Sequence, residues 1–152
     1  MKLKIKLRKA NINDLNFLFD VSTKAMLPVS QILDANKIID ENKKLQKYKA
    51  KFEPSKIQII VMNGNDVGRL RTVNRVNEIY IGGIQILPKY QRLGIGTYIL
   101  KILFEKAYKS NKSILLEVHK VNSRAIQFYQ KLVFTIESET EKQFVMRKYF
   151  TK

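Results

Sequence analysis

Hydrophobic and polar positions along the first third of the chain predict one strand followed by two helices. Apolar and basic residues alternate over residues 3–8, which is typical of a half-buried strand. An amphipathic helix is expected next, with Asn13 or Asp14 as its cap and its end before Pro28. The spacing predicts a second helix over residues 30–48, with a more polar composition.

The middle of the chain has the pattern of an antiparallel meander. Residues 57–62 and 67–73 predict strands, and residues 79–87 predict a third. The first two are separated by Asn63-Gly64-Asn65-Asp66, which favours a hairpin turn because Asn and Gly tolerate positive φ angles.

The third strand of this meander changes its pattern halfway along. Ile79 and Ile81 share one parity, whereas Ile84 and Ile86 share the other, and the change falls on Gly82-Gly83. Such a one-residue phase change at glycines indicates either a β-bulge or a strand that is buried on both faces.

The last third predicts helix, strand, helix and a closing hairpin. Apolar residues recur at helical spacing over residues 95–110, and residues 113–118 form a short apolar strand, so this crossover should make its two strands parallel. A last helix is expected to begin at Asn122 or Ser123 and to run through Leu132. Residues 134–148 then predict two strands around a turn at 139–142.

Composition limits the classes of protein to which the chain can belong. With 152 residues and 45% hydrophobic residues, we expect a single globular domain over residues 1–152. The chain has no cysteine and only one histidine, His119, so we expect no metal site. It shows neither a signal peptide nor an apolar run long enough to span a membrane, and we expect a cytoplasmic protein, either a monomer or a homodimer.

The net charge of +16 favours anionic partners such as nucleic acid, an anionic membrane or a polyphosphate ligand. The basic residues are spread from Lys2 to Lys152 instead of being gathered in one arm. Dispersed lysine is typical of a solvated surface, so dedicated nucleic-acid binding is the less favoured interpretation.

One segment has the pattern of an anion site. An apolar strand leads into Gln91-Arg92-Leu93-Gly94-Ile95-Gly96-Thr97, and a helix follows. A helix N-terminus presents unpaired N–H groups and a partial positive charge, and small residues at 94 and 96 allow a phosphate to approach the backbone.

This loop, together with a later helix, resembles the GNAT superfamily of acyl-CoA-dependent N-acyltransferases. The family's loop signature is Gln or Arg, two residues, Gly, one residue, then Gly or Ala. The residues that match the loop signature and the family's later helix are Gln91, Gly94 and Gly96, and then Asn122, Ala125 and Tyr129. The order of elements along most of the chain also agrees with the family.

The resemblance implies an α/β fold and an acetyl-CoA cosubstrate. The fold would be a mixed, twisted sheet of about six to seven strands, splayed between the fourth and the fifth, with about four helices. The pyrophosphate would bind backbone N–H groups of Gln91, Arg92, Leu93, Gly94, Ile95, Gly96 and Thr97. Backbone groups of Ile86 and Leu87 would bond the pantetheine, and one N–H there would polarise the thioester carbonyl. Asn122 would hydrogen-bond the cofactor.

The resemblance also implies acetyl transfer to a primary amine by direct attack in a ternary complex. Tyr129 would be the general acid, although a core aromatic is the alternative interpretation of this residue. Glu117 is the first candidate for the base, Glu78 the second, and a water chain a third possibility. The family usually has Gly-Phe where this chain has Val133-Phe134, so we expect the helix to end differently.

The acceptor amine is not specified by the sequence. Met26, Tyr48 and Phe52 could line an acceptor site or fill a core. A protein N-terminus, a peptide or a small-molecule amine would each be compatible with the family. The alternatives from other classes are a catalytically silent acyl-CoA-binding protein and a nucleic-acid- or ribosome-binding module with the same fold.

Overall fold

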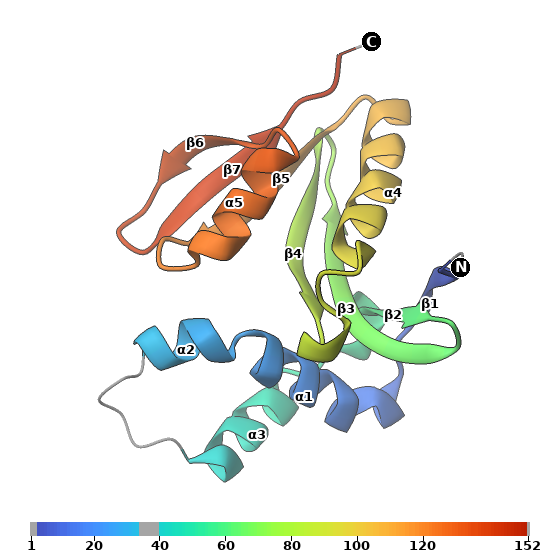
Figure 1. Cartoon of the computed structure of the whole chain (residues 1–152), viewed down its shortest axis with the longest axis vertical. Coiled ribbons are helices and arrows are strands. Elements are labelled where there is room, and N and C mark those ends of the chain that lie inside the picture. The colour runs from blue at the N-terminus through green and yellow to red at the C-terminus, as the bar shows by residue number, and fades with distance from the viewer. Residues whose placement is uncertain (1–2, 34–39, 152) are drawn as a thin grey trace. The chain divides into compact units, whose positions relative to one another are not determined.

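The computed structural model describes residues 3–33 and 40–151. Within these residues, seven strands form one mixed sheet in the order β1-β2-β3-β4-β5-β7-β6 (Figure 1). The strands are β1 (Ile5–Lys9), β2 (Gln58–Met62), β3 (Asn65–Asn74), β4 (Glu78–Ile86), β5 (Ser113–His119), β6 (Thr135–Glu139) and β7 (Gln143–Lys148). The helices are α1 (Leu15–Ala25), α2 (Leu27–Leu33), α3 (Glu41–Ala50), α4 (Ile95–Lys109) and α5 (Ser123–Lys131). The predicted α/β class and mixed sheet are confirmed.

The chain forms two compact units. Unit 1 comprises Met1–Arg71 and Gly83–Ile95, and unit 2 comprises Thr72–Gly82 and Gly96–Lys152. The hairpin of β3 and β4 belongs to both, since each strand changes unit along its length. The expectation of a single domain over residues 1–152 stays a prediction.

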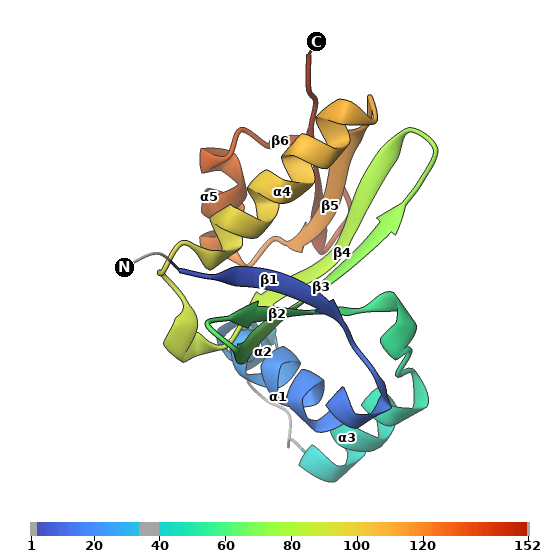
Figure 2. The same ribbon diagram turned by 90° about the vertical axis from the view of Figure 1, so that its right-hand side faces the viewer.

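In unit 1, β1 and β2 run antiparallel and side by side, with Ile5 opposite Met62 and Lys9 opposite Gln58 (Figure 2). The turn between β2 and β3 is the predicted one. Its two central residues, Asn63 and Gly64, have φ angles of 51° and 83°, the left-handed backbone that a tight hairpin turn requires.

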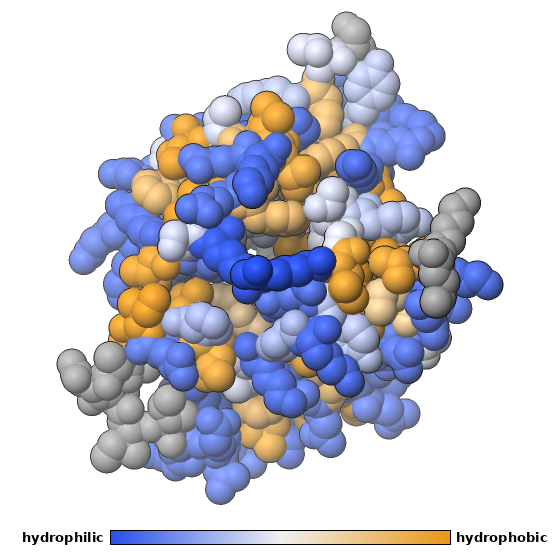
Figure 3. Space-filling model, viewed as in Figure 1, coloured by the Kyte–Doolittle hydropathy of each residue, from blue (hydrophilic) through white to orange (hydrophobic). Residues whose placement is uncertain are grey.

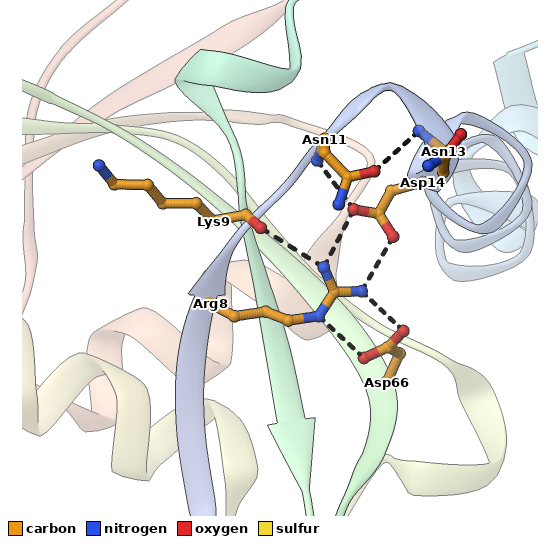
Figure 4. A network of polar contacts seen from close by, with 6 residues as sticks. All are labelled: Arg8, Lys9, Asn11, Asn13, Asp14 and Asp66. Carbon is orange, nitrogen blue, oxygen red and sulfur yellow. Dashed lines mark hydrogen bonds and ion pairs between the residues drawn. The ribbon is translucent and has the colours of Figure 1, made fainter.

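Asp14 occupies the N-cap position of α1, one of the two expected, but its side chain makes no capping hydrogen bond there. Asn11 caps a short 3-10 turn, η1 (Ile12–Asp14), that leads into the helix, and its side chain accepts a hydrogen bond from the Asn13 N–H. The Asp14 carboxylate instead accepts from the Asn11 N–H at 2.8 Å and forms two hydrogen bonds with Arg8, at 2.9 and 3.0 Å (Figure 4). Arg8 also pairs with Asp66 at 2.8 Å, so one guanidinium joins β1, η1 and β3.

The predicted helix over residues 30–48 is wrong in its extent. The chain re-enters helix at Leu27, with Pro28 in the first turn of α2, where its missing N–H has no intrahelical partner to lose. The structure then has a separate α3, whose N-cap Asp40 accepts from the N–H groups of Asn42 and Lys43. Residues 34–39, which the prediction placed inside the helix, lie outside the described residues.

The core of unit 1 lies between its strands and helices. Figures 1 and 2 both show α1 and α3 side by side. The buried cluster consists of Ala10, Leu18, Ile57, Ile59 and Val61, with Phe17, Tyr48 and Phe52 packed against it. Close approach of β3 and β4 depends on Gly68, because a Cβ there would lie 2.4 Å from the Gln85 carbonyl oxygen.

In unit 2, β4 and β5 are parallel, as the helical crossover predicted. Their pairing covers Glu78–Ile81 of β4 and Ser113–Leu116 of β5. On its other side, β5 pairs antiparallel with β7, which pairs antiparallel with β6. The buried apolar residues of this unit include Ile79, Ile81, Ile99, Leu100, Leu103, Ala107, Ile114, Leu116, Val118, Phe134 and Met146.

The burial of β4 changes at Gly82-Gly83, but no new alternation follows, because residues 84–86 are all half-buried. Ile79 and Ile81 are buried, whereas Ile84 and Ile86 are only half-buried. Pairing of β4 with β5 ends at Ile81, immediately before Gly82. The limited pairing agrees with the splay expected between these strands, and the β-bulge itself stays a prediction.

None of the helices formed by residues 3–33 and 40–151 combines the length and the apolar character needed to cross a membrane.

Candidate functional site

The glycine loop leads from a 3-10 turn, η3 (Pro88–Tyr90), into α4. Arg92 and Gly94 both have left-handed backbone, with φ angles of 63° and 85°. Glycine adopts this backbone at no steric cost, and a Cβ at position 94 would meet no atom within 4 Å. Arg92, Leu93 and Gly94 are exposed. The loop is thus an open turn ahead of a 15-residue helix, whose first N–H groups lack intrahelical partners, an arrangement that suits an anion.

Gln91 holds the end of β4 in place. Its Nε2 donates to the Ile86 carbonyl at 2.9 Å, so this side chain ties the loop to the strand before it. The Leu87 N–H donates to the Val67 carbonyl at 2.8 Å, and the Leu87 carbonyl accepts from the Tyr90 N–H at 2.9 Å. The N–H of Leu87 therefore already has a partner within unit 1, so it is less available to donate to a thioester carbonyl.

Gly96 has a different role from Gly94. A Cβ at position 96 would lie 3.3 Å from Cζ of Phe128, so glycine lets the first turn of α4 pack against the α5 aromatic within unit 2. Thr97, the last residue of the expected phosphate loop, follows in this first turn and is half-buried.

Asn122 is the N-cap of α5, one of the two caps expected. Its Oδ1 accepts from the Ala125 N–H at 3.2 Å, and its own N–H donates to the His119 carbonyl at 2.9 Å. Because the side-chain Oδ1 of Asn122 caps the helix, its Nδ2 group is the one that is suited to binding a ligand.

Tyr129 lies on the buried face of α5. Its ring packs against Phe128 and Phe134, with centroid distances of 5.4 and 5.5 Å. Burial raises the pKa of Tyr129 to about 12, because charge on the phenolate would be poorly solvated. The phenol therefore stays neutral, and able to donate a proton, throughout the physiological pH range.

The C-terminus of α5 corrects the expectation that valine ends the helix differently. Val133 has left-handed backbone at φ 68°, the conformation that glycine commonly supplies there. The Val133 N–H donates to Gln130 at 3.0 Å and the Phe134 N–H to Tyr129 at 3.0 Å. These two bonds form a Schellman motif, and the Tyr129–Phe134 ring contact is its usual apolar partner.

The two candidate bases have different surroundings in unit 2. Glu117 is exposed on the face of β5 opposite Leu116 and Val118, and its Oε1 accepts from the Tyr80 hydroxyl at 3.1 Å. Tyr80 lies on the neighbouring strand, opposite Leu115.

Glu78 pairs with two arginines, Arg75 at 2.8 Å and Arg147 at 3.1 Å. Burial by itself would raise the pKa of Glu78, but the hydrogen bonds from both arginines outweigh it and hold this pKa below its usual value. A carboxylate held this way is a weaker base. Glu78 faces Ser113 in the register, so Glu117 lies four residues further along β5, about 13 Å at strand spacing.

Tyr80 and Arg147 did not emerge as site residues from the sequence. Each depends on strand register, which places Tyr80 beside Glu117 and places Arg147 among Glu78, Glu137 and Ser113. Of the expected acceptor residues, Met26 and Tyr48 line a groove in unit 1, and Tyr48 and Phe52 both pack against the core. Within the described part of the chain, His, Asp and Glu side chains form no group of three that could hold a metal.

Comparison with known proteins places these features in a family context. Residues 27–134 match the model of the acetyltransferase (GNAT) family. A relative from Drosophila melanogaster, probable N-acetyltransferase san, is 35% identical over 81 residues, which are 52% of this chain and 44% of that protein. The match thus spans less than half the length of that relative.

Two solved structures share the fold. The PaiA N-acetyltransferase from Thermoplasma acidophilum, in complex with coenzyme A, is 20% identical with a TM-score of 0.75, covering 97% of this chain and 99% of that chain. Naa50 from Arabidopsis thaliana, in complex with the bisubstrate analogue CoA-Ac-MVNAL, is 20% identical with a TM-score of 0.61, covering 96% of this chain and 99% of that chain.

Proposed function

The chain belongs to the acetyltransferase (GNAT) family, and we propose that it transfers an acetyl group from acetyl-CoA to a primary amine. The observation that carries this proposal is the open loop at the start of α4, with its left-handed Arg92 and Gly94. The loop has the residue pattern of the family and the backbone of an anion site.

In this proposal, the pyrophosphate of acetyl-CoA binds the N–H groups of residues 91–97, and the Arg92 side chain adds positive charge. Backbone groups of Ile86 and Leu87 bind the pantetheine. Because the Leu87 N–H is bonded to Val67, the Ile86 N–H is the better candidate to polarise the thioester carbonyl. Asn122 contributes its Nδ2 group, since its Oδ1 caps α5.

Tyr129 is the proposed general acid. The amine nitrogen gives a proton to the base and attacks the thioester carbonyl carbon. The carbon–sulfur bond then breaks, the departing sulfur takes the phenolic proton, and the phenolate regains a proton from solvent. Burial raises the pKa of Tyr129 to about 12, so the phenol carries its proton when the thioester is attacked, but the same rise makes it a weaker acid, and its role rests on the family's pattern of Asn122 and Tyr129.

Glu117 is the proposed base, and the Tyr80 hydroxyl positions it. Glu78 is the weaker candidate because its two arginine partners lower its pKa. Glu117→Gln should lower kcat by about 100-fold or more, whereas Glu78→Gln removes the same charge with a smaller effect. An equal loss of kcat in both variants would contradict this assignment.

The acceptor is a peptide amino terminus or a small-molecule amine. The bisubstrate analogue bound to plant Naa50 joins coenzyme A to a peptide, so peptides are the first acceptors to test. A screen of thiol release from acetyl-CoA with peptides, polyamines, amino acids and aminoglycosides would identify the class. Binding of acetyl-CoA without transfer to any acceptor would favour a catalytically silent acyl-CoA-binding protein.

A matched pair of glycine variants tests the loop directly. Gly94 and Gly64 both have positive φ and open space at the Cβ position, so alanine at either should destabilise the fold by a similar amount, about 1 kcal/mol. Calorimetric titration with acetyl-CoA should show micromolar binding that Gly94→Ala weakens and Gly64→Ala leaves unchanged. Equal affinities in the two variants would refute the assignment of the loop.

A further inference from the structure

Unit 1 contains a groove to which the proposed steps of acetyl transfer assign no role, although it includes Met26 and Tyr48, two of the candidate acceptor residues. Its volume is about 400 Å³, which is within the range of small-molecule sites. The lining residues come from α1, α2 and α3: Phe19, Ser22, Thr23, Met26, Ser30, Lys44, Lys47, Tyr48 and Lys51. In Figure 3, mostly hydrophilic side chains cover the region of α1 and α3, with small apolar patches between them.

The charge on this groove is positive, and no carboxylate among residues 3–33 and 40–151 neutralises it by an ion pair. Lys44, Lys47 and Lys51 follow one another at helical spacing, so they share one face of α3 and its end. None of the described lining residues is a carboxylate, and no carboxylate of residues 3–33 or 40–151 pairs with these three lysines.

Three of the neighbouring acidic side chains have other partners, and the fourth, Glu41 in the first turn of α3, forms no ion pair with these lysines within the described residues. Asp20 pairs with Lys24 at 3.2 Å, and Glu53 pairs with Lys56 at 2.8 Å. Asp40 caps α3. The three ammonium groups therefore favour an anion that comes from outside this part of the chain.

Two hydroxyl groups of the groove lack hydrogen-bond partners. The hydroxyl oxygens of Ser22 and Tyr48 are shielded from solvent, and neither has a partner among the described residues. Such buried orphan groups are rare in native proteins because each one costs stability. An acceptor atom on a ligand would satisfy both.

A buried guanidinium adds positive charge near Tyr48. Arg69 on β3 donates from Nη1 to Gln85 at 2.6 Å, and its Nε has no partner within the described residues. Burial lowers the pKa of Arg69, and Tyr48 is close enough to interact with it electrostatically.

Phe19 and Met26 supply the apolar part of the lining. The Phe19 and Tyr48 rings meet edge to face at 5.5 Å, and Met26 lies on the same helix as Phe19. Aromatic rings and a thioether suit an apolar or aromatic group. The groove thus combines one apolar wall with one cationic wall.

We propose that this groove binds a small organic carboxylate with an aromatic or apolar body. The carboxylate lies against Lys44 and Lys47 and accepts hydrogen bonds from Ser22 and Tyr48, while the body contacts Phe19 and Met26. Carboxylate binding is measured without acetyl-CoA, so a negative result would leave the proposed acetyl transfer untouched.

The test compares three probes of nearly equal shape by calorimetry: 3-phenylpropionate, 3-phenylpropanamide and 3-phenylpropylamine. The carboxylate should bind at least about tenfold more tightly than the neutral amide, and the amine should not bind. Absence of carboxylate binding at millimolar concentrations, or equal binding of acid and amide, would overturn the proposal.

Two pairs of lysines on α3 separate a local site from general attraction. Lys44→Gln/Lys47→Gln should weaken 3-phenylpropionate binding by about tenfold. Lys43→Gln/Lys49→Gln removes the same charge from residues of the same helix that do not line the groove, and it should change binding little. Equal weakening by both pairs would show long-range attraction only and would refute the site.

Removal of an orphan hydroxyl gives a signature that a purely structural role would not produce. Tyr48→Phe should raise the unfolding midpoint of the ligand-free protein and, at the same time, weaken carboxylate binding. Ser22→Ala should do the same. A variant that lowers the midpoint and leaves the affinity unchanged would contradict the proposed hydrogen bonds.

Discussion

Val133 provides a quantitative test of how α5 ends. Its left-handed backbone, at φ 68°, costs a β-branched residue about 1–2 kcal/mol, and glycine avoids that cost. Glycine also gives back about 0.4–1 kcal/mol through the greater entropy of the unfolded chain. Since the Val133 side chain is 66% exposed, its loss removes little packing. The net expectation for Val133→Gly is a gain of about 1 kcal/mol in the free energy of unfolding.

Urea unfolding followed by circular dichroism measures this gain, and the melting temperature should rise by about 2–4 °C for a chain of this size. Val76 supplies the matched control, because it is 88% exposed and lies in the β3–β4 connection without a positive φ. Val76→Gly should therefore lose about 0.4–1 kcal/mol. Equal losses of stability in the two variants would refute the proposed strain at Val133.

Three further changes test other parts of the structure. Asp14→Asn should lower the free energy of unfolding at pH 7 by about 1–3 kcal/mol, measured in urea. The hydrogen bonds from Arg8 lower the pKa of Asp14 despite its burial. The stability that the Asp14 carboxylate contributes is therefore present above the unfolded pKa of about 3.9 and is lost at lower pH. A variant whose stability falls with acid as steeply as that of the wild type would contradict this contribution. Gly68→Ala should cost about 1–3 kcal/mol in the same assay, because its Cβ would overlap the Gln85 carbonyl; full stability would refute the close strand approach. Tyr80→Phe should lower kcat and shift the pH–rate profile without changing the KM for acetyl-CoA, and an unchanged profile would exclude a positioning role for Tyr80.

The sequence was most informative where local chemistry decides the structure. The Asn63-Gly64 turn, the strand–loop–helix order around Gly94 and the cap at Asn122 all follow from backbone preferences of single residues. The parallel pairing of β4 and β5 follows from the helical crossover between them.

The sequence did not reveal the register of the strands or the contacts between residues that are far apart along the chain. Aspartate is a common N-cap residue, but the carboxylate of Asp14 accepts hydrogen bonds from Arg8 on β1, a partner that no local pattern reveals. The Tyr80–Glu117 bond likewise requires strand register, because these two residues are 37 positions apart in sequence.

At Val133, tertiary packing overrides the local preference of valine for negative φ angles. The Schellman bonds and the Tyr129–Phe134 contact hold a β-branched residue in left-handed backbone. The helix of residues 30–48 failed for a local reason instead, because Asp40 caps a new helix. The groove lysines could have been found from their helical spacing, but the unpartnered hydroxyls of Ser22 and Tyr48 could not.

Steady-state release of the coenzyme A thiol is the measurement that tests acetyl transfer with Tyr129 as the acid. With an acceptor identified by the screen, the wild type should release coenzyme A in an amine-dependent manner. Tyr129→Phe should lower kcat by about 10²–10⁴-fold while leaving the KM for acetyl-CoA close to that of the wild type. An unchanged kcat in Tyr129→Phe would contradict the account.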